Sequence, residues 1–265
     1  EGTAAAATAL MTEREKRRLL AQMGLPEDAL EERPACPLCG DSGYRGGQVC
    51  RCLRKYYARE QQKELSRMLD LGGQSFETFS LNWYSDAYDP MLGISPRKNM
   101  AQILEICRSY AETFSQESGS LLPTGDPGLG KTFLSACIAR VVSEDGFSVV
   151  YDTAGHVFSQ FESAKFRRDD DGNTAGEDVE RCMNCDLLIL DDLGTEMTTS
   201  FVQSALYQLL NGRLLAGKST VISTNLDPEE LGRRYGAPLL SRLEGEYQLL
   251  PFVGTDIRRL KREQG

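Results

Sequence analysis

One segment limits the fold of this chain more than any other, the glycine-rich GDPGLGKT at residues 125–132. It matches the pattern G-x-x-x-x-G-K-S/T through Gly125, Gly130, Lys131 and Thr132, between a short apolar run and a helical pattern. Glycines let consecutive backbone N–H groups surround a phosphate, and the following helix N-terminus adds about half a positive charge. We therefore expect a phosphate-binding loop, with Lys131 on the β- and γ-phosphates and the Thr132 hydroxyl as a Mg²⁺ ligand.

This loop predicts that the chain binds ATP or ADP. The residues expected to contact the nucleotide are consecutive: Gly125, Asp126, Pro127, Gly128, Leu129, Gly130, Lys131, Thr132 and Phe133. One feature is unfavourable, because Pro123 lies in what should be a central strand and cannot donate a hydrogen bond to a neighbour there.

The rest of the C-terminal part alternates short apolar runs with helical patterns, which is typical of an α/β fold with a parallel sheet flanked by helices. Strands are predicted at 121–122, 147–151, 187–190, 219–223 and 247–250. Helices are predicted at 98–117, 131–143, 155–166, 199–215 and 227–235. The acidic segment 167–178 is expected to be a mobile surface loop.

A second motif follows about sixty residues later, where the apolar run of DLLILDD ends in Asp191 and Asp192. Carboxylates at the carboxyl end of a buried parallel strand lie at the edge of the sheet where ligands bind. This is the Walker B arrangement, in which Asp191 would hold hydrated Mg²⁺ and Asp192 would orient or deprotonate water. On the next strand, Asn225 could orient the attacking water or cap the helix that follows, or do both.

Four cysteines form a second constellation, CPLCGDSGYRGGQVCRC, with Cys36, Cys39, Cys50 and Cys52. Two close pairs separated by glycine-rich turns suit a tetrahedral Zn²⁺ with four thiolate ligands. This segment has few apolar side chains to bury, so the metal would supply its folding energy. A redox pair or free thiols are the alternatives. Residues 34–52 contain so many turn residues that no regular secondary structure is expected there.

Other isolated candidates are given structural roles. Cys182 and Cys185 adjoin the Walker B strand without a second pair nearby, so we interpret them as packing residues. His156 is the only histidine, and we expect it at a helix start in a surface or capping position. The aromatic residues Phe76, Phe79 and Trp83 are expected to pack at the entry to the core.

Charge and composition exclude several classes of protein. The net charge of −9 argues against a general polyanion binder, which would be basic. No apolar run approaches the ~18 residues of a membrane span, and the first ten residues lack the features of a signal peptide. With eight cysteines and no such signal, a soluble, cytoplasmic protein is expected.

The charge is unevenly spread and suggests two parts. Residues 1–75 carry 12 basic and 11 acidic side chains, whereas residues 76–265 carry 18 and 28. We expect residues 1–10 to be a cloning remnant without function, residues 11–75 an N-terminal zinc-binding and helical adaptor module, and residues 76–265 an ATPase domain.

Two basic segments are candidates for contact with single-stranded DNA. The predicted helix 53–70, with the preceding Arg51, mixes cations with tyrosines, but a solvated face or a protein interface explains it equally well. The second candidate follows the second strand of the α/β region. Its cations are Lys165, Arg167 and Arg168, near Phe158, Phe161 and Phe166.

In combination, several segments resemble the AAA+ helicase loaders of bacterial replication, known as DnaC or DnaI, which are similar to the IstB transposition ATPases. The similarity rests on LLPTGDPGLGKTFLS, CDLLILDDLGTE, VISTNL, PLLSRLEG and GTDIRRLK. It covers about residues 75–262 and implies an AAA+ core. By this resemblance Asn225 is sensor I, Arg242 is an arginine finger that acts across a subunit interface, and Arg258 is sensor II. An exposed surface charge is the alternative for each arginine.

The resemblance implies ATP hydrolysis, self-association, and partnership with the replicative hexameric helicase and single-stranded DNA. It also favours the segment around Lys165 for contact with that DNA, because this region faces the central channel in AAA+ loaders and initiators. DnaI-like loaders carry an N-terminal zinc module that docks on the helicase, and the four-cysteine segment looks similar. Two departures stand out. Asp192 replaces the glutamate common in AAA+ enzymes, and the sequence continues only seven residues beyond Arg258, without a full helical lid. The alternatives are an IstB-like transposition helper and a nucleotide-gated adaptor with negligible hydrolysis.

Overall fold

The computed structural model describes residues 15, 17–24, 34–57, 60, 74–166 and 174–264. The chain divides into two compact units, an N-terminal unit of residues 1–53 and a C-terminal unit of residues 54–265. This division comes earlier in the chain than the predicted boundary at residues 75 and 76, and residues 61–73 lie outside the described part. No helix of the described residues is long and apolar enough to cross a membrane.

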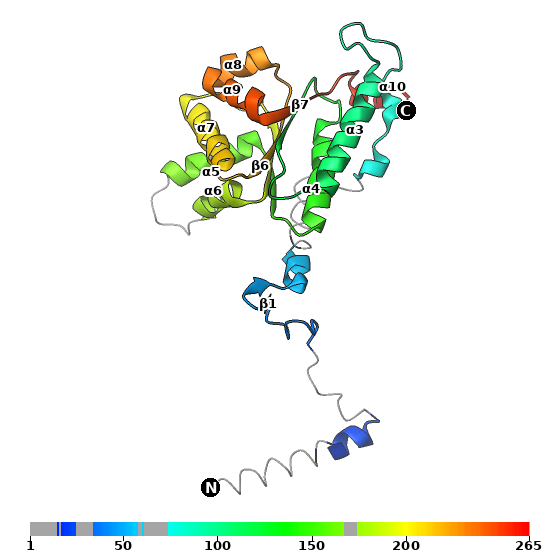
Figure 1. Cartoon of the computed structure of the whole chain (residues 1–265), viewed down its shortest axis with the longest axis vertical. Coiled ribbons are helices and arrows are strands. Elements are labelled where there is room, and N and C mark those ends of the chain that lie inside the picture. The colour runs from blue at the N-terminus through cyan, green and yellow to red at the C-terminus, as the bar shows by residue number, and fades with distance from the viewer. Residues whose placement is uncertain are drawn as a thin grey trace. The chain divides into compact units, whose positions relative to one another are not determined.

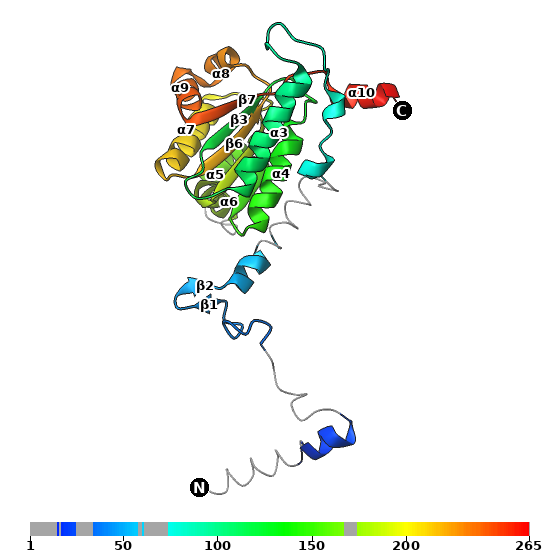
Figure 2. The same ribbon diagram turned by 45° about the vertical axis from the view of Figure 1, so that its right-hand side comes forward.

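The C-terminal unit is built on a five-stranded parallel sheet with the order β4-β5-β6-β3-β7 (Figures 1 and 2). The strands are β3 (Ser120–Thr124), β4 (Val149–Thr153), β5 (Leu187–Leu193), β6 (Ser219–Thr224) and β7 (Tyr247–Pro251). All five predicted strands are present, and Pro123 lies inside β3 between β6 and β7. The predicted parallel α/β class is confirmed.

Helices cover both faces of this sheet. On one face lie α3 (Pro96–Glu112) and α4 (Lys131–Glu144), and on the other α5 (Ala154–Phe166), α6 (Thr174–Asn184) and α7 (Ser200–Leu215) (Figures 1 and 2). A hydrophobic core lies on each face of the sheet, and alternate residues of β5 pack into one core or the other. Leu187 and Ile189 pack with α3 and α4, whereas Leu188 and Leu190 pack with α5 and α7. This alternation is the period-2 geometry of a strand buried on both sides.

The sheet is completed by shorter elements near its carboxyl edge. Two 3₁₀ turns, η1 (Phe76–Thr78) and η2 (Leu81–Trp83), precede α3. The helices α8 (Pro228–Tyr235) and α9 (Ala237–Glu246) connect β6 to β7, and α10 (Ile257–Gln264) follows β7.

The prediction of a loop at 167–178 is wrong for its last five residues. Residues 174–178 form the first part of α6, and residues 167–173 lie outside the described part. The helix forms because Val179 and Cys182 have helical spacing; Cys182 is buried, whereas the acidic side chains of this helix remain on the surface.

The N-terminal unit contains a small hairpin where no regular structure was expected. The strands β1 (Tyr44–Arg45) and β2 (Gln48–Val49) pair antiparallel, with Tyr44 opposite Val49. Gly46 and Gly47 connect them with φ angles of 59° and 80°. A two-residue turn with positive φ at both positions matches the twist of a hairpin, and only glycine adopts it without strain.

Candidate functional site

The glycine-rich loop joins the end of β3 to the start of α4, as predicted. Two of its glycines have positive φ angles and also leave no room for a side chain. A Cβ atom on Gly125, at φ 129°, would lie 2.1 Å from the carbonyl oxygen of Phe252. A Cβ on Gly128, at φ 79°, would lie 2.0 Å from the carboxylate of Asp256. The segment between β7 and α10 therefore lies against the loop, and the backbone N–H of Ile257 donates to Gly128 O over 3.0 Å.

Lys131 begins α4 and is almost fully buried, with 5% of its surface exposed. Its ammonium donates to the carbonyl oxygens of Gly125 and, over 2.8 Å, of Asp126. Burial lowers the pKa of this ammonium, while the carboxylates of Asp192 and Asp191 oppose that shift. A cation held in this way lies beside the loop whose N–H groups would surround a phosphate.

Asp191 lies in β5 with 3% of its surface exposed. Its carboxylate accepts hydrogen bonds from the Tyr151 hydroxyl over 2.8 Å and from the Ser223 hydroxyl. Burial, followed by the charge of Asp191, raises the pKa of Tyr151, so that its phenol stays a donor. The buried carboxylate is thus hydrogen-bonded by two neighbouring strands.

Asp192 differs from its neighbour in backbone and environment. The register of β5 against β6 shifts between Leu190 and Leu193, and Asp192 has a φ of 55°, in the left-handed region. Its side chain is exposed and lines the cavity described below. Partial burial, and next the charge of Asp191, raise the pKa of the Asp192 carboxyl, whereas Lys131 and Arg258 lower it. The two acids therefore have separate surroundings.

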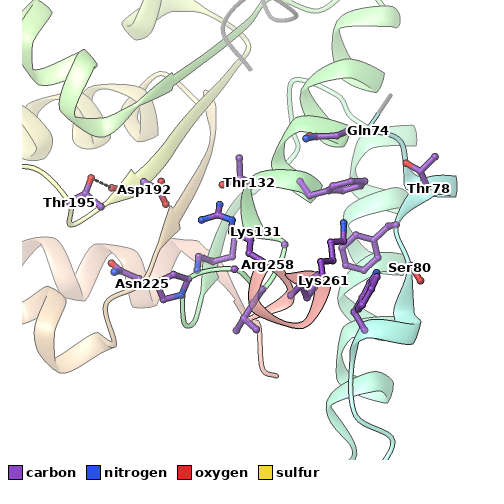
Figure 3. A pocket seen from close by; sticks show the side chains of 18 residues that line it. Gln74, Thr78, Ser80, Lys131, Thr132, Asp192, Thr195, Asn225, Arg258 and Lys261 are labelled. Carbon is purple, nitrogen blue, oxygen red and sulfur yellow. Dashed lines mark hydrogen bonds between the residues drawn. The ribbon is translucent and has the colours of Figure 1, made fainter. Parts of the chain in front are cut away.

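A cavity of about 380 Å³ opens beside the glycine-rich loop (Figure 3). Asp192, Thr195 and Asn225 lie on one side of it, and Gln74, Thr78 and Ser80 lie on the other. Lys131, Thr132 and Arg258 lie between these two groups. The remaining lining residues are Phe79, Trp83, Pro127, Gly128, Leu129, Gly130, Phe133, Ile257 and Lys261. The cavity therefore has the carboxylate of Asp192 at its sheet end, whereas the aromatic side chains of Phe79 and Trp83 are at its η1 and η2 end.

Two predicted side chains of this site reach the cavity from later elements. Asn225 follows β6 and lines the cavity, while the cap of α8 is Asp227, whose carboxylate accepts from Glu230 N over 2.8 Å. Asp227, and not Asn225, therefore caps α8. Arg258 comes from the first turn of α10.

Sequence reasoning missed the apolar end of the cavity. Phe76 packs in the core as expected, but Phe79 and Trp83 also line the cavity, together with Gln74. The amide oxygen of Gln74 is buried without a hydrogen-bond partner among the described residues. Lys261 lies over the Trp83 ring at 5.6 Å. The only signal was the aromatic density of SFETFSLNWY, which has neither strand nor helix periodicity.

Arg242 does not reach this cavity. It lies on α9, where its guanidinium is 3.4 Å from the Tyr207 hydroxyl and 5.5 Å from the centre of that ring. Arg242 is therefore not among the residues that line the cavity beside the glycine-rich loop of its own chain.

The four predicted cysteines come together in the N-terminal unit, where their sulfur atoms all lie within 4.8 Å of one another. Cys36 Sγ is 3.8 Å from Cys50 Sγ, and Cys39 Sγ is 3.4 Å from Cys52 Sγ. Four thiolates at about 2.3 Å from a tetrahedral Zn²⁺ would be about 3.8 Å apart. The donor set and its spacing therefore fit zinc.

Local hydrogen bonds hold the backbone around this cluster and shift the pKa values of its thiols. The carboxylate of Asp41 accepts from the N–H groups of Ala35 and Cys36, over 2.9 and 2.8 Å. The Leu38 N–H lowers the pKa of the Cys36 thiol to about 7, whereas the hydrogen bond with Cys39 raises the pKa of Cys52 to about 12. The hydrogen bonds within the cluster therefore act unequally on its thiols, lowering the pKa of Cys36 and raising that of Cys52.

The other cysteine pair and the histidine lie in structural positions. Cys182 and Cys185 are buried in the core, and Arg213 donates to the sulfur of Cys185 over 3.3 Å. His156 is more than half exposed in the first turn of α5 and pairs with Asp152 over 2.5 Å. These placements agree with packing for the pair and a surface role for His156.

The candidate DNA-contacting residues are only partly described. Lys165 lies over the Phe201 ring at 5.2 Å, and Phe158 is buried in the core, where it could not stack on a base. Arg167, Arg168 and the side chain of Phe166 lie outside the described residues, as does most of the predicted helix 53–70. Residues 51–57 of that segment are helical.

The residues of the carboxyl edge also fit Mg²⁺, which takes oxygen ligands and keeps several of its waters. The Thr132 hydroxyl lines the cavity and supplies one such oxygen. The Asp191 carboxylate is buried and does not line the cavity, but it is close enough to Lys131 to affect the pKa of that ammonium. Bound there, the ion would neutralise charge on the phosphates.

A family model for IstB-like ATP-binding proteins matches residues 101–259 of this chain. Among curated proteins, the replicative helicase loader DnaC of Escherichia coli (strain K12) is 26% identical over 140 residues, which are 53% of this chain and 56% of that protein. The chain spans about half the length of the curated relatives it matches.

Solved structures share the fold. A DnaC helicase loader superposes with a TM-score of 0.54 at 20% identity, over 67% of this chain and 96% of that one. A DnaI structure gives 0.55 at 18% identity, over 73% and 93%. At such identities the likeness shows the fold alone, and it agrees with the parallel α/β sheet described above.

Proposed function

This chain belongs to the family of IstB-like ATP-binding proteins, and from that premise we propose that it is an ATP-dependent loader of the replicative hexameric helicase onto single-stranded DNA. The observation that carries the proposal is the similarity of its ATPase unit to curated proteins named replicative helicase loader. The four-cysteine unit ahead of that ATPase favours a loader over a transposition helper, since it provides a separate docking module.

ATP would occupy the cavity with its phosphates in the glycine-rich loop. Lys131 would exchange the loop carbonyls for the β- and γ-phosphate oxygens, and Arg258 would add a second cation at the same end. The base would lie toward Phe79 and Trp83, where the buried amide oxygen of Gln74 could accept from an amino group. Binding thus uses charge at one end and apolar contact at the other.

Hydrolysis would use the two acids in separate roles. Asp191, tied by two hydroxyls, would hold the hydrated metal, and bound Mg²⁺ would lower the charge on the transferring phosphate. Asp192, with its raised pKa and its place on the cavity wall, would orient or deprotonate the attacking water together with Asn225. Arg242 of a neighbouring subunit would supply the remaining positive charge, worth about 10³–10⁵ in rate.

The test is helicase loading itself. Helicase from the source cell is mixed with circular single-stranded DNA, with and without this protein and ATP, and the helicase that remains on the DNA is counted. We expect helicase on the circles only when both are present. Equal loading in their absence would contradict the proposal. A pull-down with residues 11–75 as bait identifies the partner that the N-terminal module binds.

One observation favours a second function, a nucleotide-gated adaptor with negligible hydrolysis. Asp192 is one methylene shorter than glutamate, so its carboxylate reaches less far into the cavity. A single-turnover ATP assay, with and without single-stranded DNA, distinguishes the two. An Asp192→Glu variant that hydrolyses much faster, against a wild type with almost no turnover, would support the adaptor.

A further inference from the structure

The carboxylate of Asp191 is held from both sides by hydroxyl groups of the adjacent strands. Tyr151 on β4 donates to one carboxylate oxygen over 2.8 Å, and Ser223 on β6 donates to the other. All three side chains are almost completely buried, with exposed fractions of 3% for Asp191, 2% for Tyr151 and 0% for Ser223. A carboxylate with each oxygen tied to a different strand cannot rotate.

Ser223 makes a further contact that reaches the second acid. Its hydroxyl oxygen accepts from the backbone N–H of Asp192 over 3.0 Å. This N–H lies within the register shift of β5, where Asp192 takes its φ of 55°. One serine hydroxyl therefore fixes the carboxylate of Asp191 and the backbone from which the Asp192 side chain enters the cavity.

We propose that Ser223 and Tyr151 are positioning residues for the nucleotide-bound magnesium ion, acting through Asp191. The proposal rests on the proposed function, since it assumes that ATP binds with Mg²⁺. Mg²⁺ demands near-ideal octahedral geometry, so the direction in which Asp191 presents its oxygens decides how well the ion and its waters fit. Partners that orient a metal-binding carboxylate typically contribute about 10- to 100-fold to metal affinity.

A purely structural role would have different consequences. If the two hydroxyls only satisfied a buried charge, their loss would weaken the fold and would lower nucleotide affinity to the same extent with and without metal. A positioning role predicts a selective loss, because the glycine-rich loop and Lys131 would still bind the phosphates without metal.

The experiment measures binding rather than turnover, on the full chain. The affinity for a non-hydrolysable ATP analogue is determined in EDTA and over a series of Mg²⁺ concentrations. Trp83 is the only tryptophan of the chain and lines the cavity, so its fluorescence reports binding, with calorimetry as a second readout. The variants are Tyr151→Phe and Ser223→Ala, and Ser223→Thr retains the hydroxyl.

Matched controls remove the same groups elsewhere. Tyr110→Phe removes a phenol that donates to Gly119 O, and Ser219→Ala removes a hydroxyl at the other end of β6 that donates to Ser118 O. We expect Tyr151→Phe and Ser223→Ala to bind the analogue as wild type does in EDTA. Their half-saturating Mg²⁺ concentration should rise about 10- to 100-fold. Ser223→Thr should restore much of the difference, and the controls should match wild type.

Two results would overturn the inference: wild-type Mg²⁺ dependence in Tyr151→Phe, or an equal shift in the controls. Should Ser223→Ala fail to fold, Tyr151→Phe decides alone, because it keeps the ring and loses a single oxygen. Failure of the proposed function gives another outcome, in which wild type itself does not bind the analogue with or without Mg²⁺.

Discussion

At the scale of single residues, we expect nucleotide binding to depend most on Lys131. It is the only lysine that the glycine-rich loop places beside the phosphate site, and its buried ammonium already lies against the loop carbonyls. Lys131→Ala should abolish measurable ATP binding by calorimetry, a loss on the order of 100-fold or more for a charge-assisted contact. The exposed Lys98 on α3 provides the control, since Lys98→Ala should bind normally. Unchanged binding in Lys131→Ala would refute the phosphate-binding assignment.

We expect the ionised Asp192 carboxyl to lower the stability of the protein, although ATP hydrolysis would require it. The pH dependence of the melting temperature should show this loss of stability. Its pKa is raised in the folded protein, chiefly because part of its side chain is buried, so the ionised form is less favourable in the folded than in the unfolded state. The resulting penalty on stability is absent below the unfolded pKa near 4 and is fully present above the raised folded pKa. Asp192→Asn should therefore raise the melting temperature at pH 7 by a few degrees at most, because the side chain is exposed.

The same variant should lose ATP hydrolysis, since an amide cannot accept a proton from water. Melting temperatures of wild type and Asp192→Asn, measured from pH 3.5 to 7.5, should converge at the acidic end. A difference that does not change with pH would mean that the carboxyl of Asp192 has an ordinary pKa.

Residues of the site could be predicted where they lie close together in the sequence and form a recognisable motif. The glycine-rich loop and the Asp191–Asp192 pair each lie within a few residues, at a strand end that hydrophobicity alone marks. Tyr151 and Ser223 carry no such mark, since they meet Asp191 only through the strand order β4-β5-β6. Gln74 and Lys261 are nearly two hundred residues apart, and no local pattern indicates that they share a cavity.

At the scale of elements, the buried Arg213 holds the end of one helix to the sheet. Its side chain is completely buried, and its guanidinium donates to the carbonyls of Cys182 and Cys185 at the end of α6, and to Ser219 O and the Thr220 hydroxyl on β6. The carbonyls at a helix C-terminus have no partners within the helix and favour a cation.

Arg213→Met should therefore destabilise the protein by on the order of 3 kcal/mol, because several buried acceptors lose their donor at once. Chemical denaturation measures this loss. Nucleotide affinity of the folded variant should remain at the wild-type value, because Arg213 does not line the cavity. Arg181→Met, on the exposed face of α6, is the matched control and should be nearly neutral.

The four-cysteine element should owe its fold to metal. Purified protein should contain about one zinc per chain, and the double variant Cys36→Ser/Cys39→Ser should contain none. Structural zinc contributes about 10–16 kcal/mol to such small units, so a chelator should unfold the N-terminal unit. The C-terminal unit has its own apolar cores and should keep its melting transition in the same sample.

The control replaces buried cysteines of the C-terminal unit, Cys107→Ala and Cys137→Ala. It should retain zinc. Metal-free wild-type protein after purification without chelators, or zinc retained by the double variant at Cys36 and Cys39, would refute the site.

Helices and strands could be predicted where the spacing of apolar residues fits one of the two structures clearly. The helices α3, α4, α5, α7 and α8 were predicted because their apolar spacing is regular, whereas α9 and α10, on either side of β7, were not predicted. The start of α6 was missed because the acidic, glycine-containing sequence before Val179 resembles a loop, and tertiary packing of Cys182 decided the outcome. The hairpin β1–β2 was missed because a strand of two residues has no measurable alternation, although its Gly46-Gly47 turn was a usable signal.

At the scale of the whole molecule, we propose that Arg242 acts on the nucleotide of a neighbouring subunit, so that one chain would not be the complete catalytic unit. Arg242 lies on α9, away from the cavity that contains Lys131 and Arg258. A finger that reaches the γ-phosphate of a neighbour contributes to hydrolysis but little to binding. Arg242→Ala should therefore bind ATP with nearly wild-type affinity and hydrolyse it about 10³-fold more slowly or worse. Arg233→Ala, an exposed arginine on the neighbouring α8, should hydrolyse ATP normally.

A mixing experiment separates action between subunits from action within one. A Lys131→Ala subunit cannot bind ATP but still presents Arg242, whereas an Arg242→Ala subunit has an intact cavity and no finger. If the finger acts across an interface, a mixture of these two poorly active variants should recover part of the wild-type rate at hybrid interfaces. Recovery requires assembly, so it should appear only with helicase or single-stranded DNA present if those drive oligomerisation. Arg242→Ala as active as wild type, with no recovery under any assembling condition, would mean that Arg242 is a surface charge and that hydrolysis is completed within one chain.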